Sequence, residues 1–89
     1  MKENQINSAV FYAKKHLSNA ITLEYAVLLV PVKNEQRTAY SIAAEGFGES
    51  VRLDAVTRDK NEAERFFNAL VCENVKPSKI KAFIDGLTL

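Results

Sequence analysis

The first apolar pattern along the chain has a helical period. Its members are Ile6, Ala9, Val10, Ala13 and Leu17. This spacing follows the 3.6-residue turn of an amphipathic helix and predicts one over roughly residues 4 to 18. Asn19, directly after a basic stretch, is typical of a helix C-terminus. Phe11 lies about 140° from Ile6 on the same helical wheel, so an apolar ring is expected on the polar side of this helix.

From residue 21 the period changes to two. Three alternating segments follow one another, at residues 21–31, 39–46 and 50–55. Short connections join them, a polar loop at 34–37 and the turn Gly46-Phe47-Gly48, so the pattern predicts a three-stranded antiparallel meander. The first strand becomes apolar on both faces toward Pro31. This indicates that the strand has a central position in the sheet or that its second face is covered.

Two helices are predicted after the strands. Asp59 can cap the first, and Glu62 can return a hydrogen bond to it as in a capping box. The apolar stripe of this helix is Ala63, Phe66, Phe67, Leu70 and Val71. Pro77 suits the first turn of a second helix, and Gly86 predicts its end. The apolar stripe of the second helix is Ile80, Phe83, Ile84 and Leu87.

Together these elements predict an α+β fold. It consists of an N-terminal helix, a three-stranded antiparallel meander and two C-terminal helices packed on the sheet, in a single domain over residues 1–89. Hydrophobic residues make up 47% of the chain and charged residues 26%, which are ordinary globular values. A folded domain with one modest core is therefore expected.

Charge and cysteine content narrow the function classes. The formal net charge is +1, so no overall field attracts nucleic acid or anionic membranes. Cys72 is the only cysteine, which excludes an intrachain disulfide and a multi-thiolate zinc site. The N-terminus has no apolar signal region, and no apolar run reaches the length of a membrane helix. We therefore expect a cytoplasmic protein without membrane association.

The C-terminal half carries a resemblance. The segments Ala39-Tyr40-Ser41-Ile42, Lys60 to Leu70 and Asn74-Val75-Lys76-Pro77 occur in succession. In this pattern residues 38–89 resemble a small bacterial family of uncharacterised proteins, described only as a domain of unknown function. The resemblance implies the order of strands and helix and implies no activity.

Several apolar side chains lie off the predicted core faces. They are Phe11, Leu28, Val30, Phe47 and Cys72. Apolar side chains outside a core mark interaction surfaces when they gather in one place. The leading hypothesis is therefore a non-enzymatic protein-interaction module that binds another protein or a second copy of itself, without a cofactor.

Two alternatives stay open. The first is nucleic-acid or regulatory binding through a basic patch of Lys14, Lys15, Lys76, Lys79 and Lys81. The second is a small-ligand protein or an enzyme with a pocket between sheet and helices, lined by Tyr25, Tyr40 or the single histidine, His16. One histidine and one cysteine form no recognisable catalytic or metal motif, so no catalytic, cofactor or metal residue is assigned.

Overall fold

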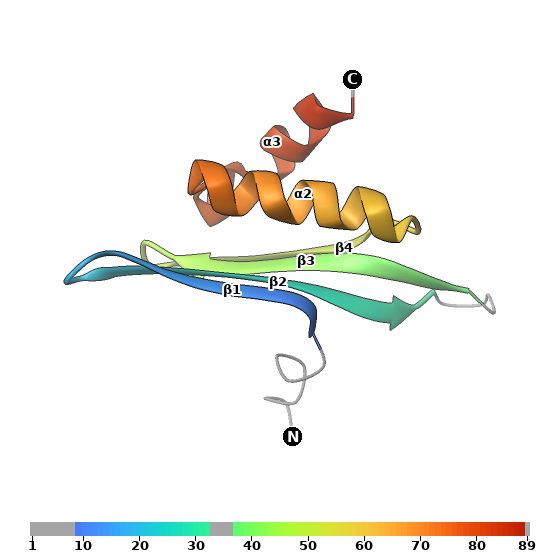
Figure 1. The fold of residues 1–89 in the computed structure, drawn as a ribbon, viewed down its shortest axis with the longest axis horizontal. Helices are drawn as coiled ribbons and strands as arrows, with labels where there is room; N and C mark the ends of the chain where they lie inside the picture. Colours follow the sequence, from blue (N-terminus) through green and yellow to red (C-terminus); the bar gives the residue numbers. More distant parts are fainter. Residues whose placement is uncertain (1–8, 33–36, 89) are drawn as a thin grey trace.

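The fold is a four-stranded antiparallel sheet covered on one face by helices (Figure 1). A computed structural model describes residues 9–32 and 37–88. The strands are β1 (Ala9–Ser18), β2 (Ile21–Pro31), β3 (Thr38–Gly46) and β4 (Glu49–Thr57). They are followed by the helix α2 (Lys60–Glu73), the 3-10 turn η1 (Pro77–Lys79) and the helix α3 (Ile80–Leu87).

The prediction of an N-terminal helix and three strands was wrong. Residues 9–18 form a fourth strand that pairs antiparallel with β2, and Ile6 lies outside the described residues. Phe11 and Ala13 lie on the helix-covered side of β1, whereas Tyr12 and Lys14 alternate with them and are exposed. The α+β class and the antiparallel meander are confirmed, with the strands in the order β1-β2-β3-β4.

The turn between β3 and β4 is a tight hairpin. Gly46 pairs with Glu49, and the two residues between them, Phe47 and Gly48, have φ angles of 55° and 74°. Positive φ at both central positions gives the backbone twist that two-residue hairpins require. Gly48 therefore serves the turn, as the sequence indicated, whereas Gly46 ends the strand in close contact with Leu23. The predicted loop at 34–37 lies almost wholly outside the described residues, although Pro31 and Thr38 on either side of it are paired.

A bulge interrupts β4 near its end. Ala55 has φ 52°, and its N–H donates to the buried Ser41 hydroxyl at 3.0 Å. Residues 54–56 of β4 lie opposite Ser41 alone, so the register shifts between Tyr40 and Ile42. As a result Val56, rather than Ala55, packs against the core, which corrects the simple alternation predicted for this strand.

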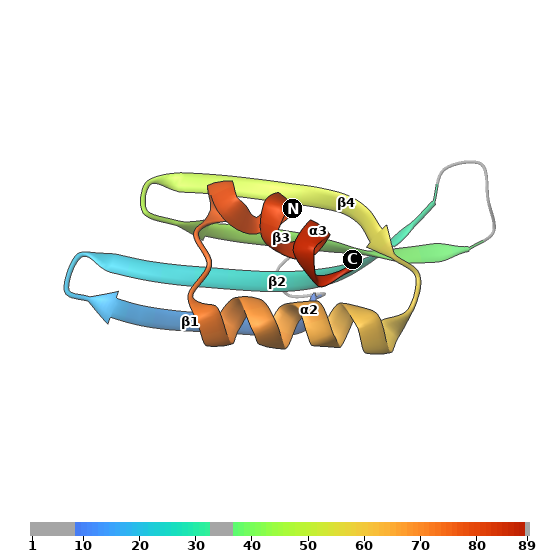
Figure 2. The same cartoon turned by 90° about the horizontal axis from the view of Figure 1, so that it is seen from above.

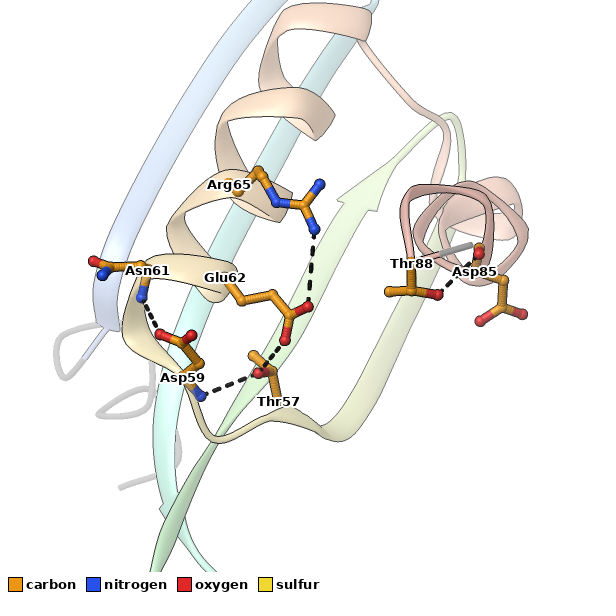
Figure 3. A network of polar contacts seen from close by, with 7 residues as sticks. All are labelled: Thr57, Asp59, Asn61, Glu62, Arg65, Asp85 and Thr88. Atoms are coloured by element: carbon orange, nitrogen blue, oxygen red, sulfur yellow. Dashed lines mark hydrogen bonds and ion pairs between the residues drawn. The ribbon is translucent and has the colours of Figure 1, made fainter.

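The start of α2 is fixed by a small polar network (Figure 3). The Asp59 carboxylate accepts from the Asn61 N–H at 2.9 Å, which confirms the predicted cap. Glu62 does not return to the Asp59 backbone. Instead, the Thr57 hydroxyl donates to Glu62 at 2.6 Å and accepts from the Asp59 N–H at 3.1 Å. Thr57 therefore replaces the direct capping-box bond and ties β4 to the helix.

The helices divide the sheet between them. In Figure 2, α2 runs along the β1 and β2 side, while η1 lies over β4 and β3, and α3 crosses β3 toward β2. The chain passes between them at Val75, whose carbonyl accepts a 2.7 Å hydrogen bond from the buried Tyr25 hydroxyl. Pro77 opens η1 as expected. The helix α3 runs through Gly86 to Leu87, one residue beyond the predicted end.

The core lies between the helices and this face of the sheet. Its fully buried members include Leu23, Tyr25, Val27, Ile42, Phe66, Leu70 and Ile80. These side chains come from both central strands and from both helices, so strands and helices share one core. We call the other face of the sheet, which is turned away from α2 and α3, the outer face.

Candidate functional site

The predicted interface residues do not form one surface. Phe11 stacks on Phe67 with ring centroids 5.5 Å apart, and so belongs to the packing under α2. Phe47 lies at the β3–β4 turn with the Lys76 ammonium 5.1 Å from its ring centre. Cys72 is exposed on α2. The remaining two, Leu28 and Val30, alternate with the core-facing residues of β2 and therefore share the outer face.

The five lysines are dispersed as well. Lys14 lies on the outer face of β1, whereas Lys15 points to the helix side and donates to the Val71 carbonyl at 2.7 Å. Lys81 forms an ion pair with Asp85 at 3.3 Å. Lys76 directly precedes η1 and Lys79 is its last residue; η1 lies on the helix side of the sheet (Figure 1). Because Lys14 lies on the opposite face, these residues form no continuous basic patch.

A groove of about 290 Å³ crosses the outer face. Its centre is one row of paired residues, one from each strand: Tyr12, Ala26, Ala43 and Arg52. The row has a large side chain at each edge and a methyl group at each central position. This sequence of sizes produces a hollow with an alanine floor, bounded by a tyrosine and an arginine.

The next row of the outer face carries charge. Lys14 pairs with Glu24, Glu24 with Glu45, and Glu45 with Ser50. Two carboxylates thus lie directly opposite each other on neighbouring strands, an arrangement that destabilises a sheet unless another group compensates it. Both also line the groove, so one of its sides is acidic.

Tyr12 is the most distinctive side chain of the groove. It is 44% exposed, and its hydroxyl donates a hydrogen bond to the Glu24 carboxylate. That bond, followed by partial burial and by the negative charge of Glu24, raises the pKa of Tyr12 above its usual value. Tyr12 therefore presents a neutral ring at neutral pH. At the other edge Arg52 forms a 2.7 Å ion pair with Asp54.

The centre of the outer face is not polar. Ala26, Leu28 and Ala39 are buried there, and the buried polar side chain Ser41 is hydrogen-bonded to the bulge. An antiparallel sheet with a water-facing side normally places polar residues on that side. The outer face therefore departs from the pattern of a solvated sheet. This agrees with the sequence of β2, which is apolar on both faces toward its end.

The alternative of a pocket between sheet and helices is not favoured. Tyr25 is fully buried and bonded to Val75, and burial raises the pKa of its hydroxyl from the usual 10.0 to about 12. His16 lies at the β1–β2 hairpin, exposed, with its Nδ1 2.9 Å from the Thr22 hydroxyl. Among residues 9–32 and 37–88, no three His, Cys, Asp or Glu side chains converge as metal ligands.

Reasoning from the sequence missed the groove residues Tyr12, Ala26, Ala43 and Arg52. Three of them lay in segments whose alternation was visible, but Tyr12 was assigned to a helix. Once residues 9–18 are assigned to a strand, the alternation places Tyr12 and Lys14 on one face, and this is the signal that could have found the site.

No protein-family model matches the chain, and no curated protein or solved structure shows significant similarity to it. The resemblance of residues 38–89 therefore stays a prediction. Within the part of the chain that the structure describes, no helix has the length and apolar character needed to cross a membrane.

Proposed function

We propose that this protein is a non-enzymatic protein-interaction module that associates with a second copy of itself through the outer face of its sheet. The observation that carries the proposal is the row Tyr12, Ala26, Ala43 and Arg52 across that face. The row is uncharged at its centre, and its two ends are chemically complementary. A surface of this kind can bind its own copy.

The two complementary ends meet when the two copies are related by a two-fold axis that is parallel to the strands and lies between the two facing sheets. Two packed sheets lie about 10 Å apart with their strands within about 30° of each other. The two-fold rotation places Arg52 of the second copy over the Tyr12 ring of the first, and the reciprocal pair forms at the other end of the row. A guanidinium over an aromatic ring contributes about 0.5 to 2 kcal/mol. Between these pairs alanine faces alanine, which lets the two sheets approach closely.

The same rotation brings the acidic rows together. Glu24 of one copy then lies near Glu45 of the other, so four carboxylates and two Lys14 ammonium groups share the interface. The resulting repulsion weakens the dimer at neutral pH.

Paired cysteines test the geometry. In a Cys72→Ser background, the double variant Tyr12→Cys with Arg52→Cys is expected to form a covalent dimer with a short bis-maleimide cross-linker, because each new thiol faces the other type in the second copy across sheets about 10 Å apart, which is too far for a direct disulfide. Either single variant lacks a matching thiol at the same position and should stay monomeric. Equal cross-linking of single and double variants would show random collision rather than this interface.

Light scattering after size-exclusion chromatography tests the association itself. We expect a concentration-dependent dimer. Ala43→Arg fills the groove floor and should abolish it, whereas Lys81→Glu, on an exposed position of α3, should not. A strict monomer at every concentration refutes the proposal. The variant Phe11→Glu is not a suitable probe, since Phe11 packs on Phe67 and its loss would disturb the fold.

A further inference from the structure

The free edge of β1 is a second surface with a defined backbone geometry. β1 pairs with β2 on one side, and within the described residues no strand pairs with its other side. The six residues Phe11 to His16 keep a regular register, from the pair Phe11–Val27 to the pair His16–Thr22. A regular edge strand presents unpaired N–H and C=O groups to which another strand can add.

The opposite edge of the sheet is less suited to such pairing. The bulge at Ala55 breaks the regular geometry of β4. In addition, η1 lies against β4, with the Ser78 N–H donating to the Glu49 carboxylate at 3.1 Å. β1 is therefore the edge with the longer regular ladder.

The charge of β1 indicates what can add to it. The strand holds Lys14, Lys15 and His16 and contains no acidic residue. Lys14 is exposed and has no hydrogen bond or ion pair among the described residues. Antiparallel pairing of β1 with itself would place the lysines of two copies on one ladder, where like charges are destabilising. Charge thus disfavours a second copy at this edge and favours an acidic strand.

The two sides of β1 differ in chemistry. On the outer side Tyr12, Lys14 and His16 are exposed. On the helix side Phe11 of β1 and Phe67 of α2 form a half-buried aromatic pair. Leu17, at the register shift near the end of the strand, is 38% exposed. Successive side chains of a strand added here would point alternately to the two sides. Those on the outer side would lie next to basic groups, and those on the helix side would lie next to apolar groups.

We propose that β1 binds an extended segment of a partner protein as a fifth strand, and that acidic residues alternate with apolar residues in this segment. Acidic side chains would lie on the outer side near Lys14, and apolar ones would lie on the helix side against Phe67. This binding uses the free backbone edge of β1 rather than the outer face; Lys14 borders both surfaces, but the ladder itself does not depend on the outer-face association.

A short blocked peptide alternating Glu and Val tests the proposal, with detection by amide chemical shifts and hydrogen exchange of the labelled protein. We expect shifts and increased protection at β1 amides that point away from β2. The charge-reversed peptide, alternating Lys and Val, should bind at least about tenfold more weakly because it opposes the lysines. A version N-methylated along its pairing edge keeps its charge but cannot form the ladder, and should not bind.

Matched variants locate the binding at this edge and test the role of its charge. Lys14→Glu should weaken binding of the acidic peptide about tenfold, and Lys14→Gln should have a smaller effect. Lys79→Glu makes the same charge change at an exposed position of η1 and should leave binding unchanged. Ala43→Arg, which should abolish the outer-face dimer, should also leave peptide binding at β1 unchanged. A failure of peptide binding and a failure of the outer-face dimer are therefore distinguishable. Equal binding of both peptides, or of the N-methylated one, would overturn the proposal, as would unchanged β1 amides.

Discussion

Replacing Tyr25 by phenylalanine removes one hydroxyl from the centre of the molecule. Tyr25 is fully buried, and its hydroxyl donates to the Val75 carbonyl at 2.7 Å, at the junction between α2 and η1. The phenylalanine ring fills the same space, so the packing is kept. The carbonyl, however, loses its side-chain partner in a site that water does not reach.

The expected cost at neutral pH follows from that lost bond. Removing one partner of a buried hydrogen bond destabilises a protein by about 1 to 3 kcal/mol. For a loss of about 1.5 kcal/mol in the free energy of unfolding and a urea slope of about 1 kcal/mol/M, which is typical of a small domain, the urea midpoint should fall. That of Tyr25→Phe should lie about 1.5 M below that of the wild type.

The pH dependence supplies a second, independent signature. Burial raises the pKa of Tyr25 from 10.0 to about 12, so the unfolded chain loses this proton at lower pH than the folded protein. Stability from this residue is therefore fully present below pH 10 and is lost as the pH rises toward 12. At about pH 11 the loss is about 1.4 kcal/mol for the wild type. Tyr25→Phe has no hydroxyl at this position and therefore lacks this pH-dependent loss of stability.

The two effects together give a sharp test. Urea unfolding followed by circular dichroism should show the wild type clearly more stable than Tyr25→Phe at about pH 8 and nearly equal to it at about pH 11. Tyr12 and Tyr40 are present in both proteins and contribute equally to the comparison. A stability difference that stays constant between these pH values would refute the assigned burial of the hydroxyl.

Two further substitutions test the turn and the bulge. Gly46→Ala should destabilise the fold by about 1 to 3 kcal/mol, because an added Cβ would lie 2.4 Å from Leu23 Cδ2 and 2.9 Å from the Thr22 carbonyl; Gly48→Ala, where no atom lies within 4 Å, is a control for backbone conformation alone. Ala55→Gly should raise stability by about 0.5 to 1 kcal/mol, since the exposed Ala55 has φ 52° and glycine adopts this conformation without steric cost. Thermal unfolding measures both, and a stable Gly46→Ala or a weakened Ala55→Gly would contradict the backbone geometry.

The strand β1 was misassigned because one of its inward-pointing residues is charged. Lys15 lies on the helix side of the sheet, where an apolar residue would have completed the alternation with Phe11 and Ala13. Its ammonium group instead reaches the Val71 carbonyl near the end of α2. The sequence shows this lysine only as polar, while Val10, Ala13 and Leu17 fit a helical stripe. The contact that explains Lys15 is made across 56 residues and cannot be seen in a local window.

The helix α2 could be predicted because its signals are local. Asp59 and the stripe beginning at Ala63 act within one segment, and the structure contains both the cap and the buried face. The groove is the opposite case. Tyr12, Ala26, Ala43 and Arg52 become neighbours only through the register of four strands, and two alanines have no distinctive chemistry on their own. Predicting the site required the register, and the register required the correct assignment of β1.

The strand order has a consequence for how the chain folds. Each strand pairs with its neighbour in the sequence, so every step of sheet formation closes only a short loop, and such contacts form quickly. The contacts of α2 with the sheet are different. Lys15 meets Val71 across 56 residues and Tyr25 meets Val75 across 50. Closing these long loops costs more entropy, so the rate-limiting event is expected to be the docking of α2 on a meander that has already formed.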